Sequence, residues 1–209
     1  MKKFILIMIL GVVPVAAASL VVFRSISARE SASVSSPPET EVSPKSAKSL
    51  QKKIDAVKKA AKVPDEAHKR TRVELSDAEL ESYVLYSLKD DIPLQVDSLD
   101  VQLGTGTIGA DTQLTFTSAN TGNPLTDALL GGTHNLFIKG KLAGEEGRGK
   151  FDLQEVRIDG IPVPKILIET ILDKYVKPKY PEVDLKEPFD LPWGIEQLTI
   201  EPGKATVVY

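Results

Sequence analysis

The chain has 209 residues and no cysteine, which excludes a disulfide framework, a thiolate metal site and an acylated cysteine. Its formal net charge is −3, but residues 1–75 carry 14 basic and 7 acidic side chains, whereas residues 76–209 carry 12 and 22. An acidic folded part argues against nucleic acid as a partner, because phosphate contacts need a basic surface.

The amino terminus predicts export. After a basic end at residues 1–3, the segment Phe4–Phe23 holds 20 residues without a charge. At about 1.5 Å per residue, a helix of that length crosses a bilayer core of about 30 Å. The alternative is a signal peptide cleaved near Ala16–Ala18, although cleavage there would leave an apolar end. Because Lys2 and Lys3 favour a cytoplasmic amino terminus, we expect a single-pass inner (cytoplasmic) membrane protein with its C-terminal domain outside the cytoplasm.

Residues 24–72 are predicted to form a flexible linker, because their Ser-, Pro- and Ala-rich first half lacks large apolar side chains. Within this linker, Ser49–Pro64 predicts a basic helix. Its apolar residues fall at helical spacing opposite a lysine face: Leu50, Ile54, Val57 and Ala61. One interpretation is a helix lying on an anionic lipid surface, and the other is a solvated spacer. The thin apolar stripe favours the spacer.

The globular domain is expected over residues 73–209. It opens with a helix in which Ser76 and Glu79 form a capping box. Apolar residues then alternate through three regions that predict antiparallel hairpins: residues 98–118, residues 134–159 and residues 195–209. The alternation slips at Gln154–Glu155, which indicates a β-bulge. Without βαβ alternation, these elements predict an α+β fold with a curved antiparallel sheet.

A long C-terminal helix is predicted to begin near Pro164 and to end before Pro178. Its apolar positions make a stripe wider than packing on one flat sheet face requires: Ile166, Leu167, Ile168, Ile171, Leu172, Tyr175 and Val176. We therefore expect the sheet to wrap around this helix. A shorter helical turn between the first two hairpins presents Leu125, Leu129 and Leu130, either as a mobile lid or membrane-touching loop or as a plug on the core.

The sequence offers little for catalysis, and we expect no enzyme, no metal and no cofactor. His68 and His134 stand without a third ligand for zinc, and no GxSxG motif places a nucleophile. His134 is expected in a surface turn. Paired carboxylates such as Glu145–Glu146 fall in turns, where solvation leaves neither pKa raised for acid catalysis. Trp193, between proline and glycine, is interpreted as a packed corner residue or as a ligand-contacting aromatic.

With these features, the chain resembles a group of uncharacterised bacterial envelope proteins that share a capped helix and a G-I/V-P-x-P helix start. The matching residues are Leu75–Ser76, Glu79–Leu80, Tyr83 and Gly160–Pro164. Over Leu75–Tyr209 it also looks like half of a tubular lipid-binding (TULIP) module. That resemblance implies a long helix in a curved sheet, with an apolar cleft between them that holds acyl chains.

Two functions remain open at this point. The first is a membrane-tethered, extracytoplasmic lipid-binding protein that holds an acyl chain in a cleft between helix and sheet. The second is a non-catalytic envelope scaffold with a fully packed core, which would bind another envelope protein. For the first function, the residues expected to contact membrane lipid are Leu80, Val84, Leu114, Phe116, Leu125, Leu129, Leu130, Ile138, Leu167, Ile168, Ile171, Leu172 and Tyr175.

Overall fold

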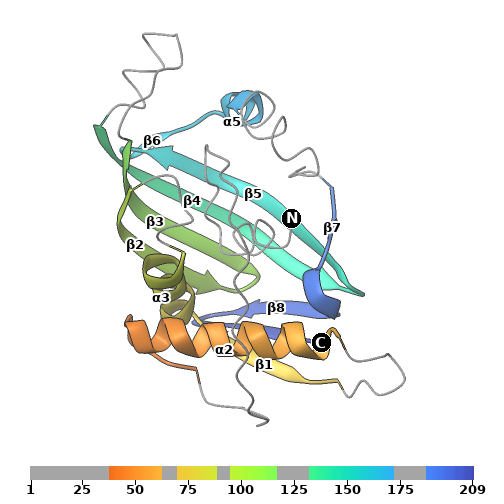
Figure 1. Cartoon of the computed structure of the whole chain (residues 1–209). Helices are drawn as coiled ribbons and strands as arrows, with labels where there is room; N and C mark the ends of the chain where they lie inside the picture. Colours follow the sequence, from red (N-terminus) through yellow and green to blue (C-terminus); the bar gives the residue numbers. More distant parts are fainter. Residues whose placement is uncertain (1–37, 63–69, 89–94, 117–131, 172–186) are drawn as a thin grey trace.

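The computed structural model describes residues 38–62, 70–88, 95–116, 132–171 and 187–209 (Figure 1). The described elements, in chain order, are α2 (Pro44–Ala60), β1 (Arg72–Ser76), α3 (Asp77–Ser87), β2 (Gln95–Gly104), β3 (Thr107–Phe116), β4 (Gly132–Glu145), β5 (Arg148–Ile158), β6 (Ile161–Pro162), α5 (Lys165–Ile171), β7 (Phe189–Asp190), η3 (Pro192–Gly194), β8 (Gln197–Glu201) and β9 (Lys204–Val208). Within these ranges no helix is both long and apolar enough to cross a membrane. The predicted anchor, Phe4–Phe23, lies outside the described residues.

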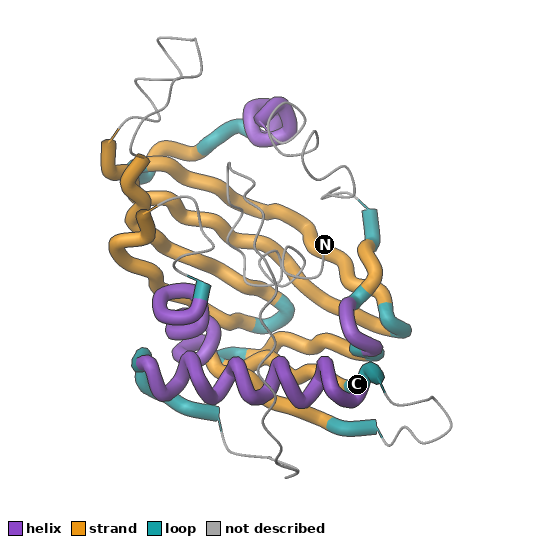
Figure 2. The backbone as a smooth tube through the Cα atoms, viewed as in Figure 1, coloured by secondary structure: helices purple, strands orange, loops and turns teal. Residues whose placement is uncertain are grey.

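The sheet is antiparallel in every described pairing. It has two parts, both drawn in orange in Figure 2. Strands β2 to β5 form one meander, and β8, β9 and β1 form the other part. The two parts meet where Gly144 of β4 pairs with Leu198 of β8. Helices α2 and α3 lie against one face, which we call the inner face (Figure 1). The expected mixture of helices with a large antiparallel sheet is confirmed.

The three predicted hairpins are all present, as β2–β3, β4–β5 and β8–β9. Their turns use left-handed backbone where the sequence supplies glycine, with φ of 64° at Gly106, 76° at Gly147 and 75° at Gly203. The predicted bulge is also confirmed. Lys139 pairs with Glu155 and the next residue, Gly140, pairs with Leu153, so that Gln154 is the additional residue in β5.

Helix α2 corrects the expectation of a solvated spacer in residues 49–64. It begins at Pro44, five residues earlier than predicted, after Ser43 has capped the backbone N–H of Ser46. Leu50, Ile54 and Val57 are 2%, 6% and 4% exposed and belong to the core. The helix is therefore part of the globular fold. Its apolar stripe is thin because only one side of the helix packs on the core, while its lysines face solvent.

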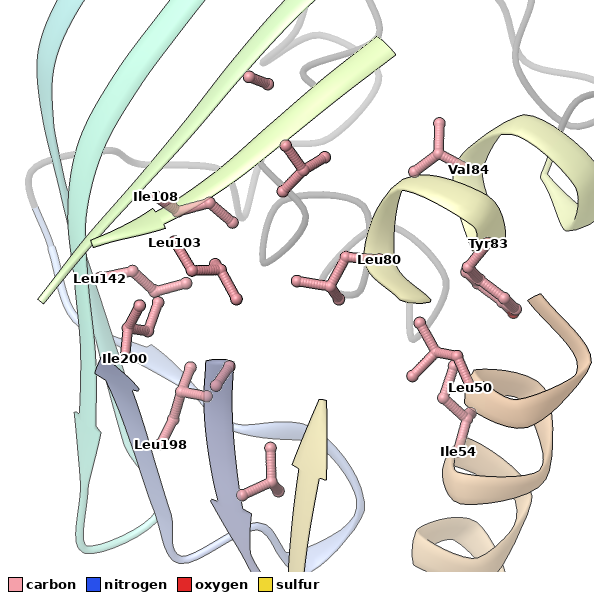
Figure 3. Packing of buried hydrophobic residues seen from close by; sticks show 14 of the residues in the cluster. Leu50, Ile54, Leu80, Tyr83, Val84, Leu103, Ile108, Leu142, Leu198 and Ile200 are labelled. Carbon is pink, nitrogen blue, oxygen red and sulfur yellow. The ribbon is translucent and has the colours of Figure 1, made fainter. Parts of the chain in front are cut away.

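Helix α3 begins as predicted, with the capping box between Ser76 and Glu79 formed in both directions. It buries Leu80, Tyr83 and Val84. Figure 3 shows Leu80 projecting from α3 toward the sheet, with Leu50 and Ile54 of α2 beneath Tyr83. The described core thus lies between these two helices and the inner face of the sheet.

Helix α5 is described as far as Ile171, and the rest of the predicted long helix lies outside the described residues. It starts one residue after Pro164, whose carbonyl accepts a hydrogen bond from the Ile168 N–H. No described residue of α5 belongs to the core cluster, and Ile166 is 75% exposed. The expectation that the sheet wraps around this helix is therefore wrong for the part of α5 that the structure describes. The helices that pack on the core are α2 and α3.

Candidate functional site

An apolar cavity of about 60 Å³ lies inside the core. Its walls come from both parts of the sheet, from α2 and α3 and from the η3 turn. Figure 3 shows several of the lining residues from the sheet and from the two helices. Apart from Lys53, its lining is apolar: Ile54, Val57, Val73, Leu75, Leu80, Leu103, Ile108, Leu142, Leu191, Pro192, Trp193, Ile195, Leu198, Ile200, Ala205 and Val207. An engineered apolar cavity of about 150 Å³ is the size that accepts benzene. The cavity is accordingly too small to contain an acyl chain.

Lys53, the charged residue of the cavity wall, belongs to a buried ion pair. Lys53 of α2 donates to both carboxylate oxygens of Glu79 at 2.7 Å and to the backbone carbonyl of Glu74 at 2.8 Å. The Glu79 side chain is 0% exposed and also accepts from Ser49 Oγ at 2.6 Å and from the Ser76 N–H at 3.1 Å. All three protons of the ammonium group have acceptors, so the pair joins α2 to α3 and β1 instead of facing a ligand.

Further along the sheet, the inner face is apolar but less covered. Leu136 pairs with Ile158, Ile138 with Val156, and Gly140 with Leu153. The bulge at Gln154 keeps these partners on one face, because one additional residue reverses the alternation. Ile138 is buried, whereas four neighbours are half-buried. We call this group the β4–β5 apolar face: Leu136, Leu153, Val156 and Ile158.

Apolar surface continues from this face into the following turn and helix. Ile161 of β6 pairs with Ile158 and is 69% exposed, and Ile166 of α5 is 75% exposed. The opposite face of the same strands is polar in character, with Arg157 stacked over the Phe137 ring at 4.1 Å from its centre. The two faces of β4 and β5 therefore differ, and only the inner one offers continuous apolar contact.

A polar pair borders the β4–β5 apolar face. His134 Nδ1 lies 2.7 Å from Asp159 Oδ2, and the other carboxylate oxygen accepts from the Asn135 N–H at 2.9 Å. The hydrogen bond with His134 and then that from Asn135 hold the pKa of Asp159 below its ordinary value. The expectation of His134 in a surface turn is wrong, since the residue lies within β4. Asp159 occupies the turn, with φ of 51°.

The η3 turn closes one end of the cavity. Trp193 lines the cavity and has φ of 59°, a left-handed conformation that is uncommon outside glycine and asparagine. The Lys58 ammonium lies 5.0 Å from the centre of its ring. The structure therefore places Trp193 at a packed corner against α2.

The predicted lipid-contacting residues separate into three groups. Leu80, Val84, Leu114 and Ile138 are buried, and of these Leu80 lines the cavity. Ile168 is half-buried in α5. The others lie outside the described residues, or within strands and helices whose backbone alone is described: Phe116, Leu125, Leu129, Leu130, Leu167, Ile171, Leu172 and Tyr175.

Sequence reasoning missed part of the apolar interior. Ile54 and Val57 were assigned to the linker, although their helical spacing was visible. Leu136, Leu153, Val156 and Ile158 were recognised as strand residues, and the bulge at Gln154–Glu155 was the signal that placed them on one face. A sequence alone does not show which part of that face the helices cover.

The chain matches no protein-family model. It matches no curated protein sequence either. Among solved structures, it is similar to a crystal structure of lipopolysaccharide binding protein, with 11% sequence identity and a TM-score of 0.22. The match covers 70% of this chain and 45% of the other chain. A likeness at this level carries no argument about fold or function.

Proposed function

We propose that this protein is a membrane-attached, non-catalytic lipid-binding protein, and that an acyl chain lies on the β4–β5 apolar face. The observation that carries the proposal is the incomplete burial of Leu136, Leu153, Val156 and Ile158 on the inner side of the sheet. Apolar residues on the inner face of a sheet are normally covered by the core, and an apolar ligand would cover these instead.

The expected interaction is hydrophobic. Covering apolar surface contributes roughly 25 cal/mol per Å², and association costs are subtracted from that sum. Each methylene group of an acyl chain adds about 0.8 kcal/mol when it leaves water. Exposed Ile161 and Ile166 would extend the contact beyond the strands. The cavity in the core is not the proposed site, because its volume of about 60 Å³ is too small.

Membrane attachment is part of the proposal and rests on the sequence. The uncharged segment Phe4–Phe23 has the length of a bilayer span, and the basic residues 1–3 favour a cytoplasmic amino terminus. The domain would then lie outside the cytoplasm, at the surface of the membrane that supplies its ligand.

The second candidate is a scaffold that binds another envelope protein. One observation favours it: the core between α2, α3 and the sheet is well filled, with a cavity of only about 60 Å³. In that case the β4–β5 apolar face would receive a protein segment and no lipid would accompany the purified chain.

The test is native mass spectrometry of the protein from residue 38 to residue 209, followed by organic extraction. The chain must include α2, because Leu50, Ile54 and Val57 belong to the core and a fragment that begins at residue 73 would lack them. We expect phospholipid or fatty acid at close to unit stoichiometry. A lipid-free mass, with no uptake from added vesicles, would support the scaffold instead.

A pair of variants locates the ligand. Leu136→Asn with Ile158→Asn makes the β4–β5 apolar face polar, and we expect it to abolish lipid retention. Phe137→Asn is the matched control, since Phe137 is also half-buried on β4 but on the opposite face. Circular dichroism checks that both variants are folded. If the double variant and Phe137→Asn then lose the same amount of bound lipid, the lipid binds elsewhere.

A further inference from the structure

The exposed side of α2 carries a straight row of lysines. Lys45, Lys48, Lys52 and Lys59 are all exposed. At 3.6 residues per turn, their spacings of 3, 4 and 7 residues place them within about 60° of one another around the helix. We call them the α2 lysine row, which extends about 21 Å along the helix at about 1.5 Å per residue.

The row is fixed in direction by the packing of the opposite side of α2. Leu50, Ile54 and Val57 are buried in the core, and Lys53 is held by the buried carboxylate of Glu79. The helix therefore cannot turn its apolar side toward a membrane and insert, as an isolated amphipathic helix does. It can present only its lysines, which restricts any contact to charged groups at a surface.

Carboxylates of the described residues neutralise little of this charge. Lys45 pairs with Glu39 at 3.1 Å, whereas Lys48, Lys52 and Lys59 have no ion pair among the described residues. Asp55, the one acidic residue of α2, accepts a hydrogen bond from Gln51. A lysine row in which one of four members has an ion-pair partner among the described residues, on a domain that is otherwise acidic, attracts an anionic surface.

We propose that the α2 lysine row docks the domain on the anionic headgroups of a lipid bilayer. This inference rests on the membrane attachment in the proposed function. Residues 24–38 separate the predicted anchor from Glu39, whose carbonyl accepts a hydrogen bond from Ser76 Oγ of the domain, and a flexible linker of 15 residues would span about 20 Å on average. Such a tether holds α2 close to the bilayer and raises its effective concentration there. Nucleic acid is disfavoured because residues 76–209 carry 22 acidic against 12 basic side chains.

The experiment uses the full chain in vesicles of phosphatidylcholine, alone or mixed with phosphatidylglycerol. Since the protein has no cysteine, a single Ala56→Cys substitution allows a fluorophore to be placed on the exposed side of α2. Energy transfer to an acceptor in the headgroups then reports docking. A fluorophore at Gln102→Cys, on exposed β2, reports a part of the domain outside α2.

We expect stronger energy transfer from residue 56 in vesicles that contain phosphatidylglycerol than in vesicles of phosphatidylcholine. This difference between the two lipids should disappear as salt rises from about 0.1 M to 1 M, because the Debye length falls from about 10 Å to 3 Å. Lys48→Gln, Lys52→Gln and Lys59→Gln together should lower the docking equilibrium constant roughly 100-fold, at about fivefold per lysine. The matched control changes three exposed lysines on the sheet to glutamine: Lys139, Lys141 and Lys150.

Each outcome decides the proposal. Transfer from residue 56 that is the same in both lipids, or that falls equally in the control triple variant, would overturn docking by α2. Flotation of the chain with phosphatidylcholine vesicles tests the anchor separately. If the chain does not float with phosphatidylcholine vesicles, the proposed membrane attachment is wrong. Docking by the α2 lysine row would still be supported if the chain floats only with vesicles that contain phosphatidylglycerol and the triple α2 variant does not.

Discussion

The buried pair of Lys53 and Glu79 predicts how strongly α2 is held to the domain. In the variant Lys53→Met, the apolar part of the side chain is retained and the ammonium group is lost. The Glu79 carboxylate, 0% exposed, would keep only Ser49 Oγ and the Ser76 N–H as donors. A charge without its partner would then remain inside the protein.

Removing one member of a buried ion pair typically costs 3–5 kcal/mol, because the remaining charge is not solvated. Domains of this kind are stable by about 5–15 kcal/mol, so Lys53→Met should remove roughly a fifth or more of the free energy of unfolding. Adding Glu79→Gln should restore at least about 1 kcal/mol, because glutamine is neutral and still suits the third position of a capping box. The two substitutions are therefore expected to be non-additive.

The measurement is urea unfolding of residues 38–209, followed by the fluorescence of the single tryptophan, Trp193, which packs against α2. The control is Lys52→Met, an adjacent exposed position, which should change stability by less than about 0.5 kcal/mol. A cost below about 1 kcal/mol for Lys53→Met, or simple additivity with Glu79→Gln, would refute the conclusion that this pair holds α2 in the core.

Two further predictions concern the sheet and its acid response. Gly140→Ala should cost about 1–3 kcal/mol in urea unfolding, because a Cβ there would lie 2.5 Å from Phe151 Cε2 and 2.9 Å from a backbone carbonyl of β5. Gly109→Ala is its control, with no atom closer than 3.8 Å, and an equal loss in both would contradict the packing argument. Because the pKa of Asp159 is lowered from 3.8, its stabilising contact with His134 is complete above that value and is lost as pH falls through the lower pKa of the folded state. Asp159→Asn should therefore show a shallower loss of stability below about pH 4 by acid titration, and an unchanged profile would refute the contact.

The hairpins could be predicted because their causes are local. Alternating side chains set the inner and outer faces, and glycines such as Gly106 and Gly203 supply the left-handed turns. The bulge at Gln154 was visible for the same reason, since a slipped alternation requires one additional residue. The capping box of α3 likewise needs only Ser76 and Glu79 at the right spacing.

The role of α2 could not be predicted in this way. Its residues show helical spacing, but a thin apolar stripe among lysines suits both a solvated spacer and a core helix. Lys53 lies on the buried side of that helix, where a lysine is costly unless it is paired. Its partner, Glu79, is 26 residues away in the chain, and only the folded structure brings the two together.

The candidate site shows the same division. From the sequence alone, the inward apolar positions of β4 and β5 were determined, and so was the basic character of the segment that became α2. The tertiary structure decided which of those positions the helices cover and which side of α2 is exposed. Coverage depends on contacts between distant segments, as where Gly144 of β4 meets Leu198 of β8, and no local periodicity records such contacts.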